Sequence, residues 1–140
     1  MKANMLKIMK LVEKYSIFPF GKMNNKRSIT FVGNLVGFID RIIEKKASGI
    51  FISMDEKSVS TTELINCLAK SFDKKVLMFK LPFLCKKIGS FFLPNLFNRL
   101  YESLEFDNTK TKVELNYKPP YSTNDGIKKM VLSYRYNKNI

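Results

Sequence analysis

The chain has 140 residues, of which 45% are hydrophobic and 26% are charged, and its formal net charge is +13. This composition is typical of one globular domain and argues against disorder over the whole length. No apolar run is long enough to span a bilayer and no signal peptide is evident, so we expect a cytoplasmic protein. The positive charge predicts an anionic partner, such as nucleic acid, a membrane surface or a phosphorylated ligand, although the lysines are scattered.

The first part of the chain predicts a helix, a break and a strand–turn–helix unit. Residues 4–14 have apolar side chains at helical spacing, and a Pro-Phe-Gly segment ends this helix. Residues 28–32 are almost all β-branched or aromatic and predict a short buried strand. Gly33 and Asn34 suit the following turn, with Asn34 as the N-cap of a second helix. Its apolar positions are Leu35, Phe38, Ile39, Ile42 and Ile43. Arg27 precedes the unit, which can hold an anion or can be a plain packing unit.

Short strands and helices continue to alternate along the rest of the chain. Residues 50–52 and 76–79 predict two further strands, and Asp55 falls in a turn where exposure to solvent is the simplest interpretation. Ser60 and Glu63 have the spacing of a capping box, which predicts a helix after Ser60. Further helices are predicted after Pro82, after Pro94, over 109–115 with Asp107 or Asn108 as the cap, and over 122–137. The predicted fold class is α/β (α+β), with strands too short for a self-sufficient sheet.

The residue types exclude several kinds of chemistry. The chain has no histidine, which excludes Ser-His-Asp and Cys-His catalysis within it, and its two cysteines lack the spacing of a zinc site. None of its six glycines has the spacing of a dinucleotide-binding loop. Tyr134 and Lys138 have the Tyr-x-x-x-Lys spacing of short-chain dehydrogenases, but they lie at the end of the chain without a cofactor loop, so a frayed basic helix end is the favoured interpretation. We predict no catalytic, cofactor-binding or metal-binding residue in this chain.

A series of short motifs occurs in one order along nearly the whole chain. Its first members are Lys2-Ala3-Asn4-x-Leu6, Pro19-Phe20-Gly21, Asn25-Lys26-Arg27-Ser28 and Val32-x-Asn34-Leu35-Val36. Its later members are Ile50-Phe51-Ile52-Ser53-x-Asp55, Val59-Ser60-Thr61-Thr62-Glu63-Leu64, Arg99-Leu100-x-x-Ser103-Leu104-x-x-Asp107-x-x-Lys110 and Leu115-x-Tyr117-x-Pro119-Pro120. The series resembles the C-terminal, substrate-binding portion of extended short-chain dehydrogenases/reductases, in particular bacterial NAD-dependent UDP-N-acetylglucosamine or UDP-glucose 4-epimerases of surface-polysaccharide pathways.

The resemblance implies a single substrate-binding domain over residues 1–140, truncated so that it lacks the Rossmann module. In such enzymes that module holds NAD and the catalytic tyrosine and lysine, so this chain would bind a UDP-sugar without catalysing alone. By position, Arg27 and Arg99 would face the diphosphate, and Asn4 would lie near the nucleotide-sugar. The alternatives are surface cations for the arginines and a helix cap for Asn4. The usual acidic residue before Asn34 is Gly33 here, so capping at that turn should differ.

Loss of the Rossmann module also has a physical consequence. We expect an exposed apolar patch around Ile17, Phe18, Phe20 and Phe31, with low stability or a need for a Rossmann-containing partner chain or a homodimer.

Two alternative functions stay open on the sequence. A small basic nucleic-acid-binding module would explain the net charge, although no recognition motif is present. A peripheral membrane protein would use residues 83–93, which are apolar with one basic pair.

Overall fold

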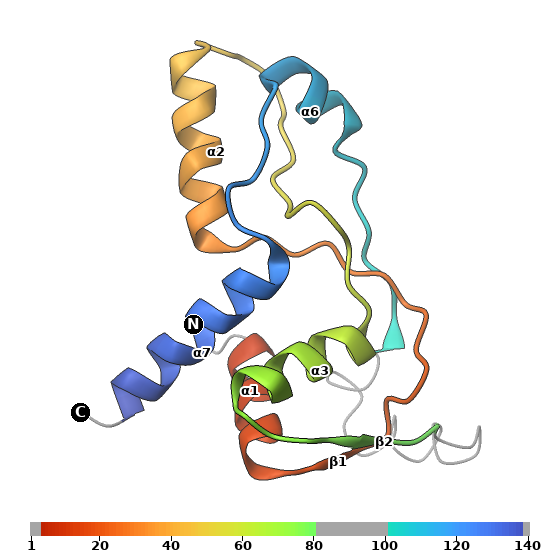
Figure 1. The fold of residues 1–140 in the computed structure, drawn as a ribbon. Coiled ribbons are helices and arrows are strands. Elements are labelled where there is room, and N and C mark those ends of the chain that lie inside the picture. The colour runs from red at the N-terminus through yellow and green to blue at the C-terminus, as the bar shows by residue number, and fades with distance from the viewer. Residues whose placement is uncertain (1–3, 81–100, 139–140) are drawn as a thin grey trace.

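The computed structural model describes residues 4–80 and 101–138 (Figure 1). These residues form α1 (Asn4–Lys14), β1 (Ile17–Phe18), α2 (Val32–Glu44), α3 (Thr61–Ser71), β2 (Leu77–Met78), α6 (Thr109–Leu115) and α7 (Thr123–Lys138). The predicted α/β class is confirmed, as are the bounds of α1 and α6, and α7 starts and ends one residue later than predicted. The helices predicted after Pro82 and Pro94 lie outside the described residues.

The hydrophobic core lies at one end of the molecule, among α1, α3, α7 and the small sheet (Figure 1). Helix α3 packs against both α1 and α7, and its amphipathic pattern directs one face into the core. β1 pairs with β2 in parallel, with Ile17 opposite Leu77 and Phe18 opposite Met78. The buried core residues are Ile8, Met9, Val12, Phe18, Phe20, Leu64, Ile65, Leu68, Ala69, Phe72, Ile127 and Val131.

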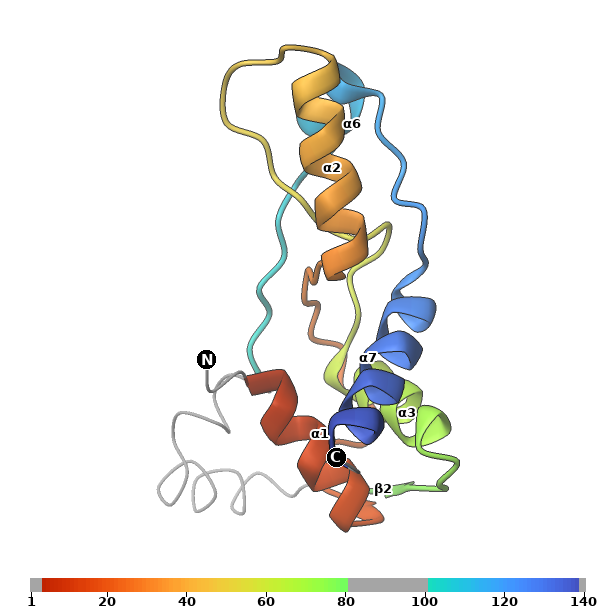
Figure 2. The ribbon, with the colours of Figure 1, turned by 90° about the vertical axis from the view of Figure 1, so that its left-hand side faces the viewer.

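Helices α2 and α6 form the opposite end, and extended segments connect the two ends (Figure 2). The Arg41 guanidinium of α2 donates from Nε to the carbonyl oxygen of Leu115 at 2.9 Å, which satisfies one of the free carbonyls at the end of α6. The rings of Phe38 and Tyr117 pack edge to face with centroids 5.6 Å apart. These contacts attach the inner face of α2 to the chain around α6.

The predicted strand content is partly wrong. Residues 28–32 and 50–52 form no strand, and the predicted strand over 76–79 is reduced to Leu77–Met78. Residue 27 makes only isolated bridges, to Val59 and Leu104. A β-branched run favours an extended backbone, but a ladder also needs a neighbouring strand, and the described residues supply none there. Phe18 and Phe20, expected in an exposed patch, are buried, whereas Ile17 is exposed.

Helix α2 starts earlier than predicted because a distant carboxylate caps it. Its N-cap is Phe31, so Asn34 lies inside the helix. Asp55 Oδ1 accepts hydrogen bonds from the Phe31 backbone N–H at 3.0 Å and from Asn34 Nδ2 at 2.7 Å. Asp55 is only 1% exposed, so its predicted place in a solvated turn is wrong. Its carboxylate lies at the positive end of the helix dipole, where a negative group stabilises the helix.

Asn34 links this cap to the start of α7. Its Nδ2 also donates to the carbonyl oxygen of Tyr121 at 2.9 Å, and its Oδ1 accepts from the Tyr121 N–H at 3.0 Å. The Tyr117 hydroxyl donates to the Asn34 carbonyl oxygen at 2.7 Å. The Asp55–Asn34–Tyr121 network therefore joins three segments that are distant in the sequence.

The predicted capping box opens α3. Ser60 Oγ accepts from the Glu63 N–H at 3.1 Å, and Glu63 Oε2 accepts from the Ser60 N–H at 2.7 Å. The reciprocal pair satisfies two backbone donors at the helix start.

The C-terminal end of α7 is fixed to α1 rather than frayed. Glu13 Oε2 accepts from the Tyr134 hydroxyl at 2.9 Å, and Lys138 Nζ lies 2.7 Å from Glu13 Oε1. The hydrogen bond with Lys138 is the main cause that lowers the pKa of Glu13, and the same bond raises the pKa of Lys138.

Replacing Asn34 should destabilise the whole domain. Asn34→Ala removes both side-chain bonds to Tyr121 and one donor to Asp55, leaving buried polar groups unpaired, and should lower the free energy of unfolding by about 2–4 kcal/mol. Urea unfolding would measure this loss. Asn66→Ala, at an exposed position of α3, is the control and should change stability little. Equal stability of the two variants would contradict the assigned role of the network.

Glu13→Gln should lower the melting temperature at neutral pH by roughly 2–4 °C, because the pair is partly exposed and contributes modestly. The lowered Glu13 pKa contributes stability above about pH 4.3, which is lost as the pH falls. The raised Lys138 pKa contributes stability below about pH 10.4, which is lost as the pH rises. In melting curves from pH 3 to 11, the melting temperature of Glu13→Gln should therefore fall less than that of the wild type at acid and alkaline pH. The exposed control Glu56→Gln should keep the wild-type pH dependence. Parallel profiles of the wild type and Glu13→Gln would refute this assignment.

Candidate functional site

Arg27 lies where three segments of the chain meet. Its backbone exchanges two hydrogen bonds with Val59, at 3.0 and 2.9 Å, in an antiparallel bridge. On its other side it bridges Leu104 in parallel, through Leu104 N–H to Lys26 O at 2.8 Å and Ser28 N–H to Leu104 O at 2.9 Å. The guanidinium Nη1 donates to the carbonyl oxygen of Glu102 at 3.2 Å. The backbone of Arg27 is thus held in place independently of its side chain.

Side-chain hydrogen bonds fix the same junction. The buried Asn25 donates from Nδ2 to Thr61 Oγ1 at 3.0 Å and to the Glu102 carbonyl at 3.2 Å, and its Oδ1 accepts from the Thr61 N–H at 3.1 Å. Ser103 Oγ accepts from the Lys26 N–H at 3.0 Å. The start of α3 and the segment after residue 100 are therefore tied to the chain just before Arg27.

A polar cavity of about 500 Å³ opens beside this junction. Two lysines, Lys22 and Lys80, line it and make its electrostatic character positive. Tyr101 donates from its hydroxyl to the Pro19 carbonyl oxygen at 2.8 Å, and burial raises the pKa of Tyr101, so this wall stays uncharged. The complete lining is Pro19, Gly21, Lys22, Met23, Asn24, Asn25, Lys80, Tyr101 and Ser103. The cavity has the chemistry to receive a polar, anionic ligand.

Gly21 allows the close backbone approach that shapes this cavity. Its N–H donates to the Phe79 carbonyl oxygen at 2.9 Å, and a Cβ at this position would lie 2.8 Å from the Phe79 carbonyl carbon. A larger residue would push the two segments apart.

The structure describes only one of the three predicted ligand residues in full. Arg27 lies at the junction described above. Asn4 is the first residue of α1, and its side chain is outside the described part of the molecule, as is the whole of Arg99.

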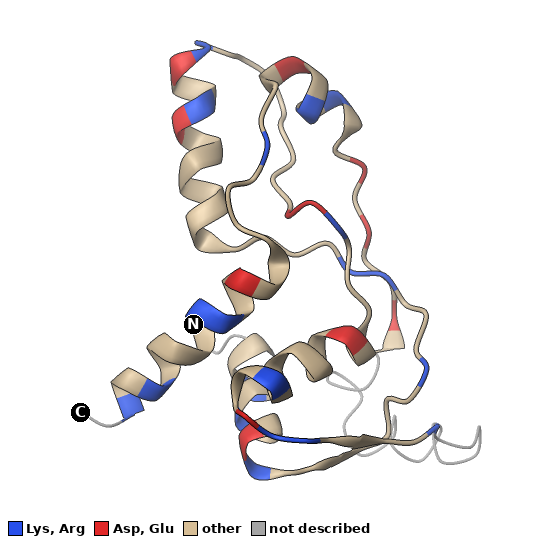
Figure 3. Ribbon diagram, viewed as in Figure 1, with Lys and Arg blue, Asp and Glu red and all other residues tan. Residues whose placement is uncertain are grey.

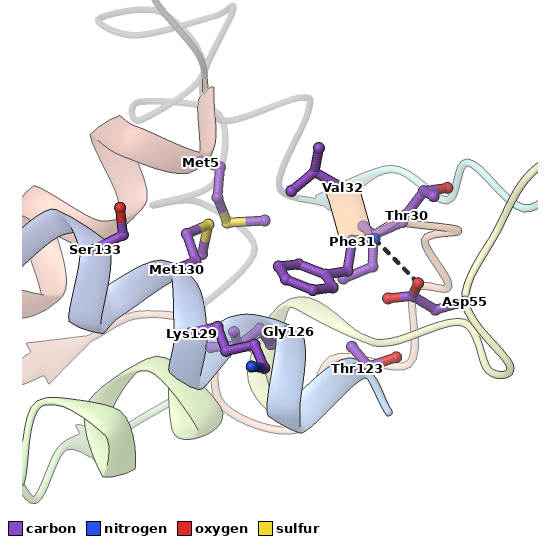
Figure 4. Close-up of a pocket in the computed structure, with 12 residues that line it drawn as sticks. Met5, Thr30, Phe31, Val32, Asp55, Thr123, Gly126, Lys129, Met130 and Ser133 are labelled. Atoms are coloured by element: carbon purple, nitrogen blue, oxygen red, sulfur yellow. Dashed lines mark hydrogen bonds between the residues drawn. The ribbon is translucent and has the colours of Figure 1, made fainter. Parts of the chain in front are cut away.

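A second cavity, of about 600 Å³, is an apolar groove between the first turn of α1, the start of α2 and α7 (Figure 4). Met5, Phe31 and Met130 surround it, and Asp55 lies at one end, bound to the Phe31 N–H. The complete lining is Met5, Ile29, Thr30, Phe31, Val32, Asp55, Thr123, Gly126, Ile127, Lys129, Met130 and Ser133. Such a surface suits apolar contacts rather than acid–base chemistry.

The Tyr134 and Lys138 pair does not have the electrostatics of a dehydrogenase tyrosine. Burial is the main cause that raises the pKa of Tyr134, and the hydrogen bond to Glu13 raises it further. A catalytic tyrosine of this type needs a lowered pKa, because it acts as a base. The pair therefore serves to attach α7 to α1.

Positive charge is distributed over the molecule rather than gathered in one place. Figure 3 shows Lys and Arg on helices at both ends and on the connecting segments, with Asp and Glu among them on most helices. Among the described residues, no helix is long and apolar enough to cross a membrane, and no group of side chains could hold a metal ion.

Sequence reasoning missed the residues that hold the junction and the cap. Asn25 belongs to one of the ordered motifs, but the residues around it give no sign that its side chain is buried, because its partner Thr61 is distant in the sequence. Asp55 follows a β-prone run, which gives a weak signal that it returns to the core. The hydrogen bonds of Asn25 and Asp55 join residues that come together only in the folded chain.

Comparisons with known proteins agree with this architecture. The chain is 35% identical over 138 residues to the UDP-glucose 4-epimerase of Vibrio cholerae, covering 95% of this chain and 42% of that enzyme. The structure of UDP-N-acetylglucosamine 4-epimerase from Bacillus cereus superposes with a TM-score of 0.66 at 13% identity, over 96% of this chain and 42% of that one. No protein-family model matches the chain. The chain spans less than half the length of these two relatives, and the two matches support its assignment to the epimerase/dehydratase family.

Proposed function

We propose that this chain forms the nucleotide-sugar binding portion of an NAD-dependent UDP-sugar 4-epimerase and does not catalyse epimerisation alone. The observation that carries the proposal is the likeness to a UDP-glucose 4-epimerase along nearly the whole chain. The Arg27 junction and its cationic cavity support it, because a diphosphate needs fixed positive groups beside a polar opening. The cytoplasmic location and the surface-polysaccharide role that the resemblance implies belong to the same proposal.

The glycines of α2 do not form a dinucleotide-binding loop. Gly33 and Gly37 lie within α2 rather than in a loop between a strand and a helix. A Cβ at Gly33 would lie 2.6 Å from a Phe31 ring carbon, and one at Gly37 would lie 3.0 Å from the Tyr117 hydroxyl. These glycines make room for aromatic side chains and do not cradle a pyrophosphate. We therefore assign no step of hydride transfer to this chain.

The roles of its own residues concern binding and orientation. A guanidinium at Arg27 would pair with phosphate oxygens, while the bridges to Val59 and Leu104 hold its backbone. Lys22 and Lys80 would add positive charge at the cavity wall. A second arginine at position 99 would complete the diphosphate site that the resemblance implies.

Calorimetry with UDP tests this proposal. Arg27→Ala should weaken UDP binding by about 10- to 100-fold, the effect of losing charge-assisted hydrogen bonds. Arg99→Ala should have a similar effect, whereas uridine, which lacks the diphosphate, should bind both variants and the wild type equally. Lys26→Ala is the matched control, because this neighbouring lysine is exposed and lies 3.6 Å from Glu105.

Unchanged UDP affinity in both arginine variants, or no UDP binding by the wild type, would reject the proposed function. Fluorescence anisotropy with duplex DNA at low and moderate salt examines the nucleic-acid alternative in the same preparation. Tight, steeply salt-dependent DNA binding without UDP binding would favour that alternative.

A further inference from the structure

The side-chain amide of Asn25 is buried and held in one orientation. Its Oδ1 accepts from the Thr61 N–H at 3.1 Å, and its Nδ2 donates to Thr61 Oγ1 at 3.0 Å. A reversed amide would place Nδ2 against the Thr61 N–H, so that two donors would face each other. Thr61 is the first residue of α3 and is fully buried. The amide of Asn25 is therefore fixed against a rigid part of the molecule.

The same amide also holds the carbonyl group that the Arg27 side chain contacts. Asn25 Nδ2 donates to the Glu102 carbonyl oxygen at 3.2 Å, and Arg27 Nη1 donates to the same oxygen at 3.2 Å. Asn25 and Arg27 are alternate residues of one segment, which is extended where Arg27 forms its bridges, and alternate residues of an extended chain project to the same side. One carbonyl oxygen thus joins a buried amide to the guanidinium.

This shared carbonyl restricts a side chain that has many rotamers of its own. A ligand that must order a long side chain on binding loses affinity through the entropy of that side chain. The bond to Glu102 uses one N–H of the Arg27 guanidinium and leaves other N–H groups for phosphate oxygens. An arginine that is already oriented before the ligand arrives loses less entropy when the ligand binds.

Asn25 lines the polar cavity, but its amide hydrogens are already used within the protein. They are bonded to Thr61 Oγ1 and to the Glu102 carbonyl oxygen. A ligand in the cavity would take one of them only by breaking a bond between buried or partly buried groups, which is unfavourable. The amide is therefore suited to orient a neighbouring group rather than to contact the ligand.

We propose that Asn25 is a positioning residue for phosphate recognition. It fixes the Glu102 carbonyl, and this carbonyl orients the Arg27 guanidinium that would pair with the diphosphate of a nucleotide-sugar. The inference rests on the proposed function. Because Asn25 acts through Arg27, its contribution to ligand affinity should disappear when the Arg27 side chain is removed.

The order of the Arg27 side chain tests this role without a ligand. In the 15N-labelled chain, the Nε–H order parameter of Arg27 from NMR relaxation should be lower in Asn25→Ala than in the wild type. Arg41 is the internal control: its Nε donates to the Leu115 carbonyl oxygen at 2.9 Å, so its order parameter should not change. Thr61→Val removes a buried hydroxyl but keeps the bond between Asn25 and Glu102, so Arg27 should stay ordered in this variant.

Asn25→Ser guards against misfolding of the alanine variant. Serine keeps a polar group beside Thr61 but has a single donor on a shorter side chain, so it should also lower the order of Arg27. Unchanged order of Arg27 in both Asn25 variants would overturn the proposal, as would an equal loss of order in Thr61→Val.

Calorimetry with UDP measures the coupling between Asn25 and Arg27. Asn25→Ala should weaken UDP binding by about three- to tenfold and leave uridine binding unchanged. In the Arg27→Ala background, Asn25→Ala should cause no further loss, because the two residues act as one unit. Asn66→Ala is the matched control, since this asparagine is exposed on α3, and it should leave UDP affinity unchanged.

The double-mutant cycle separates positioning from the other roles that Asn25 would have. An equal loss of UDP affinity with and without the Arg27 side chain would mean a general structural role or a direct ligand contact, and would overturn the proposal. Loss of Arg27 order in Asn25→Ala, together with no UDP binding by the wild type, would reject the proposed function alone. UDP binding that depends on Arg27 but not on Asn25 would reject this inference alone.

Discussion

The buried Asp55 carboxylate is the interaction on which the rest of the structure depends. The middle of the molecule has no sheet among the described residues, so its extended segments need another means of alignment. Asp55 accepts from the N–H of Phe31, the N-cap of α2, and from Asn34, and Asn34 in turn bonds both backbone groups of Tyr121. Gly126 allows Phe31 to lie against the start of α7, since a Cβ there would approach the Phe31 side chain to 2.8 Å. One carboxylate thus orients α2, α7 and the chain between them.

The two ends of the molecule differ in how complete they are. The end built from α1, α3 and α7 encloses its own core, with the Glu13 pair fixing the last turn of α7. On the end built on α2, Phe38 and Tyr117 pack on one face of the helix. The exposed apolar residues of α2 are Val32, Leu35, Val36, Ile39 and Ile43.

The polar junction and the apolar groove differ in their chemistry. Arg27 is held by backbone bridges on both sides. The cavity beside the junction is lined by Lys22 and Lys80, whose positive charges would stabilise a phosphate group. The groove is lined mainly by apolar side chains and is suited to burial. Asp55 lies between the two regions: its N–H donates to the Ile29 carbonyl oxygen, and its carboxylate caps α2.

The sequence alone determined the helices, because their signals are local: the apolar period of residues 4–14, the Ser60–Glu63 capping box and the pattern of residues 109–115 all depend on neighbours within a few positions. The ordered motifs also indicated the family. Only the tertiary structure decided which β-prone runs pair, that Asp55 rather than Asn34 caps α2, and which apolar face of α2 remains exposed. These outcomes depend on partners such as Val59, Leu104 and Tyr121, which are distant in the sequence, and no local pattern encodes which distant segment will supply a neighbour. The place of Arg27 follows the same rule, since the residue type suggested phosphate binding but the bridges that hold it form only in the folded chain.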